Sequence, residues 1–270
     1  MDVTVQIVHY HSLGLLRETL RSLRKAAPRV SYEVFVVDNN PGFRLPPTLV
    51  EEFPEARVLS PSRHLGFGGG HNFAAQKAAG DFLLILNPDI FILPGSLEEL
   101  VAYARRHSDV GVVAPRLLYP DRTLQYSCYR FRHTPLKLLG RTFVQGFSAI
   151  AERLSEHKME DVSHGETMEV DWVLGACLCV PRALWKRLGG FDERFLLYFE
   201  DVDFCRRVWQ IGSRVVYHPA STMLHYHRRE GADGSLWSQL WSRANWIHVV
   251  SWAKYLSKYF RKPLPCRSHN

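Results

Sequence analysis

The sequence predicts an α/β fold with a doubly wound, mostly parallel central sheet flanked by helices in three layers. Strand-like and helix-like segments alternate through the first hundred residues, and such alternation favours right-handed βαβ units. The segment "FLLILNPDI", residues 82–90, runs through five apolar residues without polar alternation before it reaches Asn-Pro-Asp. Such a run is typical of a strand buried on both faces, as in a parallel sheet covered by helices.

The expected elements follow in order along the chain. The first strand is predicted at residues 3–8, and "LLRETLRSLRKA" after it has apolar residues at helical spacing. "YEVFVVDNN" predicts the second strand, and a glycine-rich bend with a helix ending at Gly80 precedes the strand "DFLLIL". "SLEELVAYARRH" predicts another amphipathic helix. After Gly111, "VGVVAPRLLYPD" and "RVVYHP" indicate strands, residues 119–170 are irregular, and "FEDVDFCRRVWQIG" indicates a helix.

Composition narrows the class of protein. The 270 residues are 46% hydrophobic, which is enough for a substantial core. A net charge of +7 suits a polyanion, an anionic membrane surface or a phosphorylated small molecule. The five cysteines include no C-x-x-C pair, so neither a disulfide framework nor a zinc site is indicated. The N-terminus has no signal-peptide pattern and no apolar run approaches the ~20 residues of a membrane span, so we expect a cytoplasmic protein.

Polar side chains follow three strands at their carboxyl ends. The first strand ends at His9 and Tyr10, the second at Asp38, and the third at Asn87 and Asp89. Each could be ordinary turn chemistry, since Asp and Asn are favoured there. In open α/β sheets, however, ligands bind outside the carboxyl ends of the strands. Three such ends joined by a glycine-rich bend indicate a shared crevice.

Asp89 needs a partner, because an unpaired carboxylate at the end of a buried strand is costly. A divalent ion such as Mg²⁺ would supply one, with diphosphate oxygens and water completing its shell. The bend "LGFGGGHN" lets backbone approach a phosphate closely, although a flexible helix entry is an equally simple interpretation. It lacks the dinucleotide fingerprint, which disfavours a nicotinamide or flavin enzyme.

Two later segments add candidate groups. "YFEDVDFCRR" places Glu200, Asp201 and Asp203 near the start of a helix, where carboxylates are also favoured by the helix dipole. A carboxylate crowded by aromatic side chains acquires a raised pKa, which suits a general base acting on a sugar hydroxyl. In "MLHYHRR", His225 or His227 offers either a nitrogen ligand or a purely structural group.

At these residues the sequence resembles the family 2 glycosyltransferases of GT-A fold, in particular the rhamnosyltransferase-like branch that builds bacterial surface polysaccharides. The resemblance spans nearly all of residues 3–225 and runs through "VVDNN", "HLGFGGGHN", "LLILNPDIFILPGSL", "WVLGACLCVPRALWKRLGGFDERFLLYFEDVDFCRRV" and "YHPASTMLHY". It implies a GT-A domain over residues 1–232, with a donor-binding half at about 1–110 and an acceptor and catalytic half at about 111–232. Residues 233–270 would form an amphipathic helical extension.

The resemblance also implies roles for individual residues. Asp38 would recognise the nucleotide base, and Asp201 would be the catalytic base. Asp89 and His225 would bind Mg²⁺ or Mn²⁺. The other implied site residues are Glu200 beside the catalytic base; His9, Tyr10, Gly66, Phe67, Gly69, Asn72 and Asn87 in the donor pocket; and Trp172 and Gly175 in the acceptor pocket.

The implied reaction is an inverting single displacement. A sugar, with rhamnose as a candidate, would move from a dTDP- or UDP-linked donor to a saccharide or lipid-linked acceptor, and nucleic acid is not an expected partner. A non-catalytic nucleotide-sugar-binding subunit remains an alternative, because His11, His64 and His71 stand where the family commonly has asparagine. A sugar-1-phosphate nucleotidyltransferase is a weaker alternative, since its glycine-rich basic signature is not visible in residues 1–24.

The C-terminal segment carries an aromatic and basic stripe at helical spacing. Its members are Trp237, Trp241, His248, Trp252, Tyr255 and Tyr259, with Lys254, Lys258, Arg261 and Lys262 adding positive charge. Such a helix can lie on an anionic bilayer as a peripheral contact. The alternatives are that it packs on the catalytic domain or forms a homo-oligomer contact.

Overall fold

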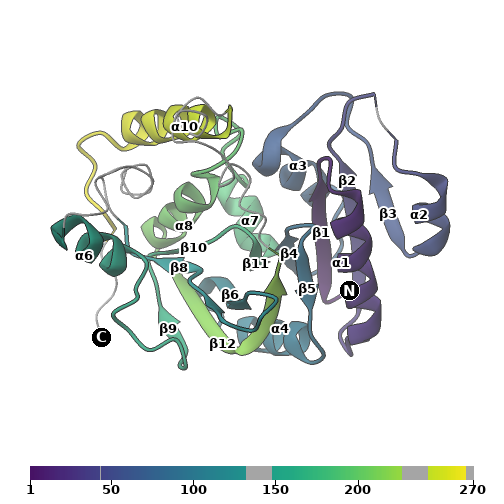
Figure 1. Ribbon diagram of the computed structural model, residues 1–270, viewed down its shortest axis with the longest axis horizontal. Coiled ribbons are helices and arrows are strands. Elements are labelled where there is room, and N and C mark those ends of the chain that lie inside the picture. Colours follow the sequence, from purple (N-terminus) through teal and green to yellow (C-terminus); the bar gives the residue numbers. More distant parts are fainter. Residues whose placement is uncertain (43, 132–147, 227–242, 266–270) are drawn as a thin grey trace.

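The computed structural model describes residues 1–42, 44–131, 148–226 and 243–265 (Figure 1). The strands are β1 (Val3–His9), β2 (Tyr32–Asp38), β3 (Ala56–Leu59), β4 (Phe82–Leu86), β5 (Ile90–Ile92), β6 (Val110–Leu118), β7 (Leu124–Gln125), β8 (Cys128–Tyr129), β9 (Met168–Glu169), β10 (Trp172–Val173), β11 (Cys177–Pro181) and β12 (Arg214–His225). The helices are α1 (Leu13–Ala26), α2 (Pro47–Glu52), α3 (Gly66–Ala75), α4 (Ser96–Arg106), α6 (Ser148–His157), α7 (Arg182–Leu188), α8 (Glu200–Gln210) and α10 (Arg243–Tyr259). The alternation predicted for the first hundred residues is confirmed.

Within the described residues, ten strands form one mixed sheet in the order β3-β2-β1-β4-β11-β6-β12-β5, with β7 on β6 and β9 on β12. β1 pairs in parallel with β2 and β4, and β6 pairs in parallel with β12. β11 runs antiparallel to β4, with Cys177 opposite Leu86. The residues just before β11 therefore lie at the edge where β1, β2 and β4 end.

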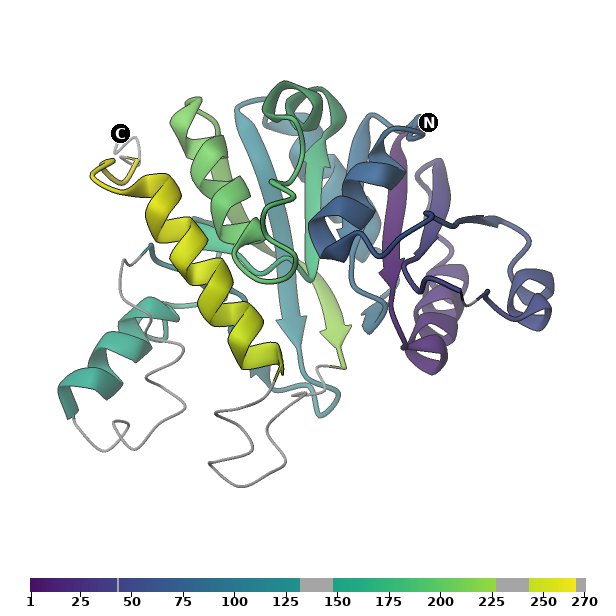
Figure 2. The same cartoon turned by 90° about the horizontal axis from the view of Figure 1, so that it is seen from above.

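Helices cover both faces of the sheet (Figures 1 and 2). One buried apolar cluster contains side chains of α1, α2 and α4, and the other contains side chains of α3, α7 and α8. Consecutive residues of β4 alternate between the two clusters, with Leu84 in the first and Leu83 and Ile85 in the second. A pleated strand with two covered faces favours apolar residues at consecutive positions, which explains the unbroken apolar run of β4.

The glycine-rich segment itself forms the helix α3, where the sequence predicted a bend followed by a helix ending at Gly80, and α3 ends at Ala75. Gly66 has a φ of +75°, and a Cβ there would collide with the carbonyl oxygen of Leu196. A Cβ at Gly70 would lie 2.8 Å from a methyl group of Val8. The glycines therefore let α3 pack directly on β1 and on the loop that precedes α8.

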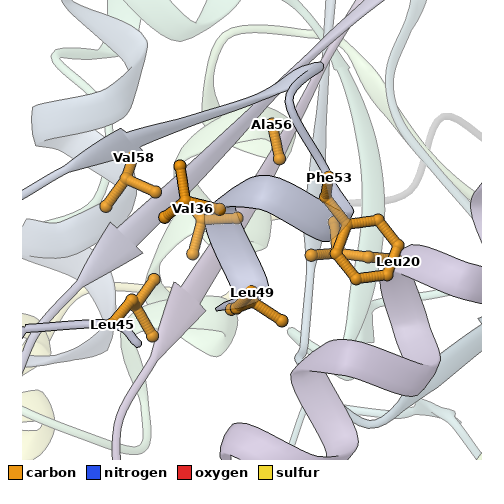
Figure 3. A pocket seen from close by; sticks show the side chains of 8 residues that line it. Leu20, Val36, Leu45, Leu49, Phe53, Ala56 and Val58 are labelled. Carbon is orange, nitrogen blue, oxygen red and sulfur yellow. The ribbon is translucent and has the colours of Figure 1, made fainter. Parts of the chain in front are cut away.

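Two hollows lie away from the strand ends. A gap of about 10 Å³ under α2 is lined by Leu20, Val36, Leu45, Leu49, Val50, Phe53, Ala56 and Val58 (Figure 3). It is an apolar packing gap. It has barely the room that one water needs, and its lining side chains offer no polar partner to hold a water. An open hollow of about 330 Å³ borders Phe82 and Arg182, at the opposite edge of the sheet from the end of β4.

Of the described helices, none has the length and apolarity that crossing a membrane requires.

The C-terminal helix α10 packs alongside α8 (Figures 1 and 2). Tyr255 and Tyr259 are buried in a small cluster with Phe195. Asp203 of α8 is fully buried, accepts a hydrogen bond from the Tyr259 hydroxyl at 2.8 Å and forms an ion pair with Lys258. Part of the predicted aromatic and basic stripe therefore packs against α8 and the loop before it.

α10 also contacts the loop before α8. The Ser251 hydroxyl donates to the Leu197 carbonyl at 2.9 Å, and the Lys254 ammonium donates to the Arg194 carbonyl at 2.7 Å. On the outward side of the helix, Trp246 is 53% exposed. Trp237 and Trp241, the first two members of the predicted stripe, lie outside the described residues.

Candidate active site

Asp89 and His225 lie next to each other at the end of β12. Strand pairing places His225 opposite Ile90, the residue after Asp89. His225 Nε2 lies 3.3 Å from Asp89 Oδ1, and the Tyr226 N–H donates to the Asp89 carbonyl at 2.9 Å. His225 is 1% exposed. The two residues that the resemblance assigns to the metal are therefore in contact although they are far apart in the sequence.

This pair offers ligands that suit a divalent cation. Asp89 Oδ1 is buried, and no donor in the described part of the chain makes a hydrogen bond to it. A carboxylate oxygen and an imidazole nitrogen are both ligands for Mn²⁺, and Mg²⁺ also takes carboxylate oxygen. The described residues contain no group of three or more His, Cys, Asp or Glu side chains arranged to hold a metal. Two protein ligands would leave the other positions to phosphate oxygens and water.

Asp201 lies in the first turn of α8 and is 7% exposed. Its Oδ2 accepts the Gly175 N–H at 3.0 Å, and its Oδ1 accepts the Val202 N–H at 2.8 Å. A Cβ on Gly175 would lie 3.3 Å from the Asp201 Cβ and 3.4 Å from the Phe67 ring. Gly175 therefore brings this carboxylate close to α3 and holds it with a backbone donor.

Backbone hydrogen bonds connect the surroundings of the two aspartates. Gly175, which holds Asp201, is followed by Ala176, whose carbonyl accepts the Asn87 N–H at 2.9 Å. Asn87 precedes Asp89 by two residues, and the Asn87 carbonyl accepts a hydrogen bond from the Ile90 N–H at 3.3 Å. Both carboxylates thus belong to the same edge of the sheet, beyond the carboxyl end of β4.

Asp38 and His9 end adjacent strands and are paired in the register of β1 and β2. Asp38 Oδ1 accepts the side-chain N–H of Asn40 at 2.9 Å. Asp38 Oδ2 is buried and accepts no hydrogen bond from the described residues. A free acceptor of this kind fits an N–H group of a nucleobase. Burial lowers the pKa of His9, opposed by the nearby charge of Asp38, so the neutral imidazole is favoured.

Tyr10 follows β1, and its aromatic ring lies beside His64, which precedes α3. Its side chain is 48% exposed, and its ring meets those of His11 and His64 edge-on at centroid distances of 4.3 and 4.8 Å. His64 Nδ1 accepts the Gly66 N–H at 3.2 Å. The Asn39 amide donates to the Gly66 carbonyl at 3.0 Å. Asn39 therefore fixes the entry to α3, whereas the sequence indicated only that it ends a strand.

The other α3 residues that the resemblance assigns to the donor pocket contact other parts of the protein. The Phe67 N–H donates to the Leu196 carbonyl at 3.0 Å. The Asn72 side chain donates to the Phe191 carbonyl and accepts the Phe191 N–H, both at 2.9 Å. A Cβ on Gly69 would approach Leu65 and Glu193. Asn72 and Gly69 thus contact the loop before α8 in this structure, and their donor-binding role stays a prediction.

Trp172 and Glu200 are both buried, each 4% exposed. The Trp172 ring stacks on Tyr129 with centroids 4.1 Å apart and an interplanar angle of 15°. Burial raises the pKa of Tyr129 well above its ordinary value, so its hydroxyl stays neutral. Trp172 therefore packs β10, the strand that leads to Gly175, against β8. Its contact with an acceptor stays a prediction.

Gln125 is a site residue that the sequence did not indicate. Its Oε1 lies 2.8 Å from His225 Nδ1, on the side of the imidazole away from Asp89. It belongs to β7, a two-residue strand within the segment predicted to be irregular. No periodicity could have revealed so short a strand.

Comparisons with known proteins agree with this geometry. The model of "Glycosyltransferase like family 2" matches residues 1–247. The chain is 28% identical over 273 residues to the N-acetylglucosaminyl-diphospho-decaprenol L-rhamnosyltransferase of Mycobacterium tuberculosis (strain CDC 1551 / Oshkosh), covering 94% of this chain and 87% of the relative. It is 25% identical over 263 residues to rhamnosyltransferase WbbL of Escherichia coli (strain K12), covering 95% and 93%.

A solved structure supports the fold. The crystal structure of GalNAc-T7 with UDP, GalNAc and Mn²⁺ matches with a TM-score of 0.69 at 18% identity. The match covers 96% of this chain and 48% of that one, so this chain spans about half its length. The predicted GT-A fold is confirmed. The sequence resemblance, the family match and the site geometry agree: this chain belongs to glycosyltransferase family 2.

Proposed function

We propose that this chain is an inverting, metal-dependent glycosyltransferase. It moves a sugar, with rhamnose as the first candidate, from a nucleotide-diphosphate sugar to a saccharide or lipid-linked acceptor in surface polysaccharide synthesis. The observation that carries the proposal is the presence of the Asp89–His225 pair and of Asp201 at one edge of the sheet. Two rhamnosyltransferases among the relatives supply the sugar candidate, and the UDP and Mn²⁺ bound to GalNAc-T7 support the donor class and the cofactor.

On the donor side, one set of residues would bind the nucleobase and another would hold the ion that binds the diphosphate. Asp38 Oδ2, which accepts no hydrogen bond from the described residues, would accept a nucleobase N–H, and the exposed Tyr10 ring would cover the base. Asp89 and His225 would hold Mg²⁺ or Mn²⁺. The ion supplies positive charge that stabilises the diphosphate as it leaves. The alternative of a sugar-1-phosphate nucleotidyltransferase finds no support in the family match.

On the acceptor side, Asp201 would act as the general base. It would take the proton of the acceptor hydroxyl while that oxygen bonds to the anomeric carbon and the diphosphate leaves with the electron pair of the broken bond. A single displacement of this kind inverts the anomeric configuration. The N–H groups of Gly175 and Val202, one on each carboxylate oxygen, would hold Asp201 in the orientation that proton transfer requires.

The acceptor side also suggests where the enzyme works. Trp246, Val250 and Phe260 are 53%, 46% and 70% exposed along and just after α10, and the chain carries a net charge of +7. A lipid-linked acceptor would be reached by peripheral contact of this face with the cytoplasmic surface of an anionic membrane. Co-sedimentation with anionic vesicles should fall on Trp246→Gln. Equal binding by the variant and the parent chain would count against the membrane contact.

The experiment that tests the proposed function is a panel of nucleotide sugars in thermal-shift and transfer assays, with and without Mn²⁺. Specific donors stabilise the native state by mass action, and we expect dTDP-rhamnose with Mn²⁺ to give the largest rise in Tm. Donor turnover separates an enzyme from a non-catalytic binding subunit. If no nucleotide sugar raises Tm in the presence of Mn²⁺, the proposal fails.

A further inference from the structure

We propose that Gln125 is a positioning residue that sets the tautomer of His225 for metal binding. The inference rests on the metal site of the proposed function. Gln125 Oε1 lies 2.8 Å from His225 Nδ1, and His225 Nε2 lies 3.3 Å from Asp89 Oδ1. One imidazole ring therefore connects the amide to the carboxylate through its two nitrogens.

The chemistry of the amide decides which ring nitrogen carries the proton. A carbonyl oxygen has no hydrogen to give, so His225 Nδ1 must donate to Gln125 Oε1. In the neutral ring, a proton on Nδ1 leaves the lone pair on Nε2, which is the nitrogen facing Asp89. A lone pair and a carboxylate oxygen then converge as cation ligands. The opposite tautomer would point an N–H at Asp89 and remove one ligand.

The fold places Gln125 for this contact. In the pairing of β7 with β6, Gln125 lies opposite Leu117, and Leu117 lies opposite Met223 of β12. The amide thus reaches His225 across β6 from one side, while β5 brings Asp89 from the other. Gln125 is 5% exposed. At such burial, loss of the acceptor would leave a polar ring N–H without its partner, and the ring would turn or change tautomer.

A tight turn holds β7 in this register. The Tyr119 N–H donates to the Thr123 carbonyl at 2.9 Å, and Asp121 Oδ1 accepts the Thr123 N–H at 2.9 Å. The hairpin between β6 and β7 is therefore closed by backbone and side-chain bonds. Gln125 stands on a rigid element, as a residue that orients a metal ligand should.

A purely structural role would give a different result from a positioning role. If Gln125 only satisfied a buried imidazole, its loss would lower stability and leave the affinity of the remaining ligands unchanged. If it positions His225, its loss must lower metal affinity, and the effect must disappear when His225 is absent. Partners that orient a metal-bound histidine typically contribute 10- to 100-fold in affinity.

The test measures Mn²⁺ binding to the full chain by electron paramagnetic resonance in the presence of UDP. We expect Gln125→Leu to weaken Mn²⁺ binding about 10- to 100-fold and Gln125→Glu, which keeps an acceptor oxygen, to restore most of it. In a His225→Asn background, Gln125→Leu should cause no further loss. Ser221→Ala is the matched control, because it removes a buried hydrogen bond to the Ser96 carbonyl from the same strand without touching His225.

A second measurement examines the tautomer in the parent chain without metal, and a variant serves only to assign the His225 signals. The ¹⁵N chemical shifts of His225, assigned with His225→Asn, should show the proton on Nδ1 at pH 8. A proton on Nε2 would overturn the inference, as would equal Mn²⁺ affinity in Gln125→Leu and the parent. In both cases the proposed function would stand. A parent chain that binds no Mn²⁺ with UDP would overturn the metal site and this inference together.

Discussion

The Gly175 N–H donates to Asp201 Oδ2 at 3.0 Å, and a Cβ at Gly175 would lie 3.3 Å from the Asp201 Cβ. Gly175→Ala should therefore displace the carboxylate by a few tenths of an ångström. We expect kcat to fall about 10-fold with little change in Tm, because small misplacements of a catalytic group are costly. Gly14→Ala is the control, since a Cβ there meets nothing within 4 Å. Unchanged kcat in Gly175→Ala would show that this contact does not position Asp201.

Asp201→Asn tests the base directly. The amide is nearly isosteric but cannot accept a proton, so transfer should fall by about 10² to 10⁴-fold while Mn²⁺-dependent donor binding is kept. Single-turnover transfer and calorimetric donor binding measure the two properties separately. Undiminished transfer would remove Asp201 from its assigned role.

The ion pair between α10 and α8 should contribute to stability. Asp203 is fully buried and is bonded by Lys258, Tyr259 and Arg207. Lys258→Met removes one charged partner of a buried carboxylate, and we expect the free energy of unfolding to fall by about 1–3 kcal/mol. Lys254→Met is the control, because Lys254 is exposed and, within the described residues, donates to the backbone carbonyl of Arg194 and to no carboxylate. Urea unfolding gives the free energy of unfolding of both variants. An equal decrease in the two would show that the buried ion pair contributes no more to stability than the exposed contact of Lys254.

His71 should make the fold sensitive to acid. It is fully buried, neither ring nitrogen has a partner within the described residues, and burial lowers its pKa to about 3. The unfolded chain binds a proton below the ordinary value of 6.5, whereas the folded chain does not until about pH 3. The contribution of His71 to the free energy of unfolding is therefore present above pH 6.5 and decreases by up to about 1.4 kcal/mol per pH unit as the pH falls between these values.

Replacing His71 should flatten this dependence. His71→Leu has a similar volume and no proton to bind, so its free energy of unfolding should change less between pH 6.5 and pH 4.5 than that of the parent. His71→Gln should behave in the same way. Urea unfolding at several pH values gives the slopes, and identical slopes in the parent and both variants would contradict this assignment.

The strand at residues 82–86 could be predicted because its apolar run reflects burial on both faces, a property that the local sequence records. The strand at residues 3–8 could be predicted from its β-branched residues. The helical state of the glycine-rich segment could not. Glycine lowers helix propensity, and α3 exists because its missing side chains allow contact with Val8 and Leu196. That contact joins residues far apart in the chain, which no local pattern reports.

The candidate site shows the same division. Polar strand ends predicted that Asp38 and Asp89 lie at one edge, but the contact between Asp89 and His225 followed only from the family resemblance. Gln125 and the pairing of Asp203 with Lys258 escaped prediction because each depends on tertiary packing of distant segments. Residues 227–242, which include His227, Trp237 and Trp241, lie outside the described part of the chain.

The most direct test of the central claim is calorimetric binding of a nucleoside diphosphate with and without Mn²⁺, to the parent chain and to Asp89→Ala. If Asp89 and His225 hold the ion that binds the diphosphate, Mn²⁺ should strengthen binding to the parent at least about 10-fold and have little effect on the variant. A variant that keeps the full Mn²⁺-dependent gain in affinity would contradict the account.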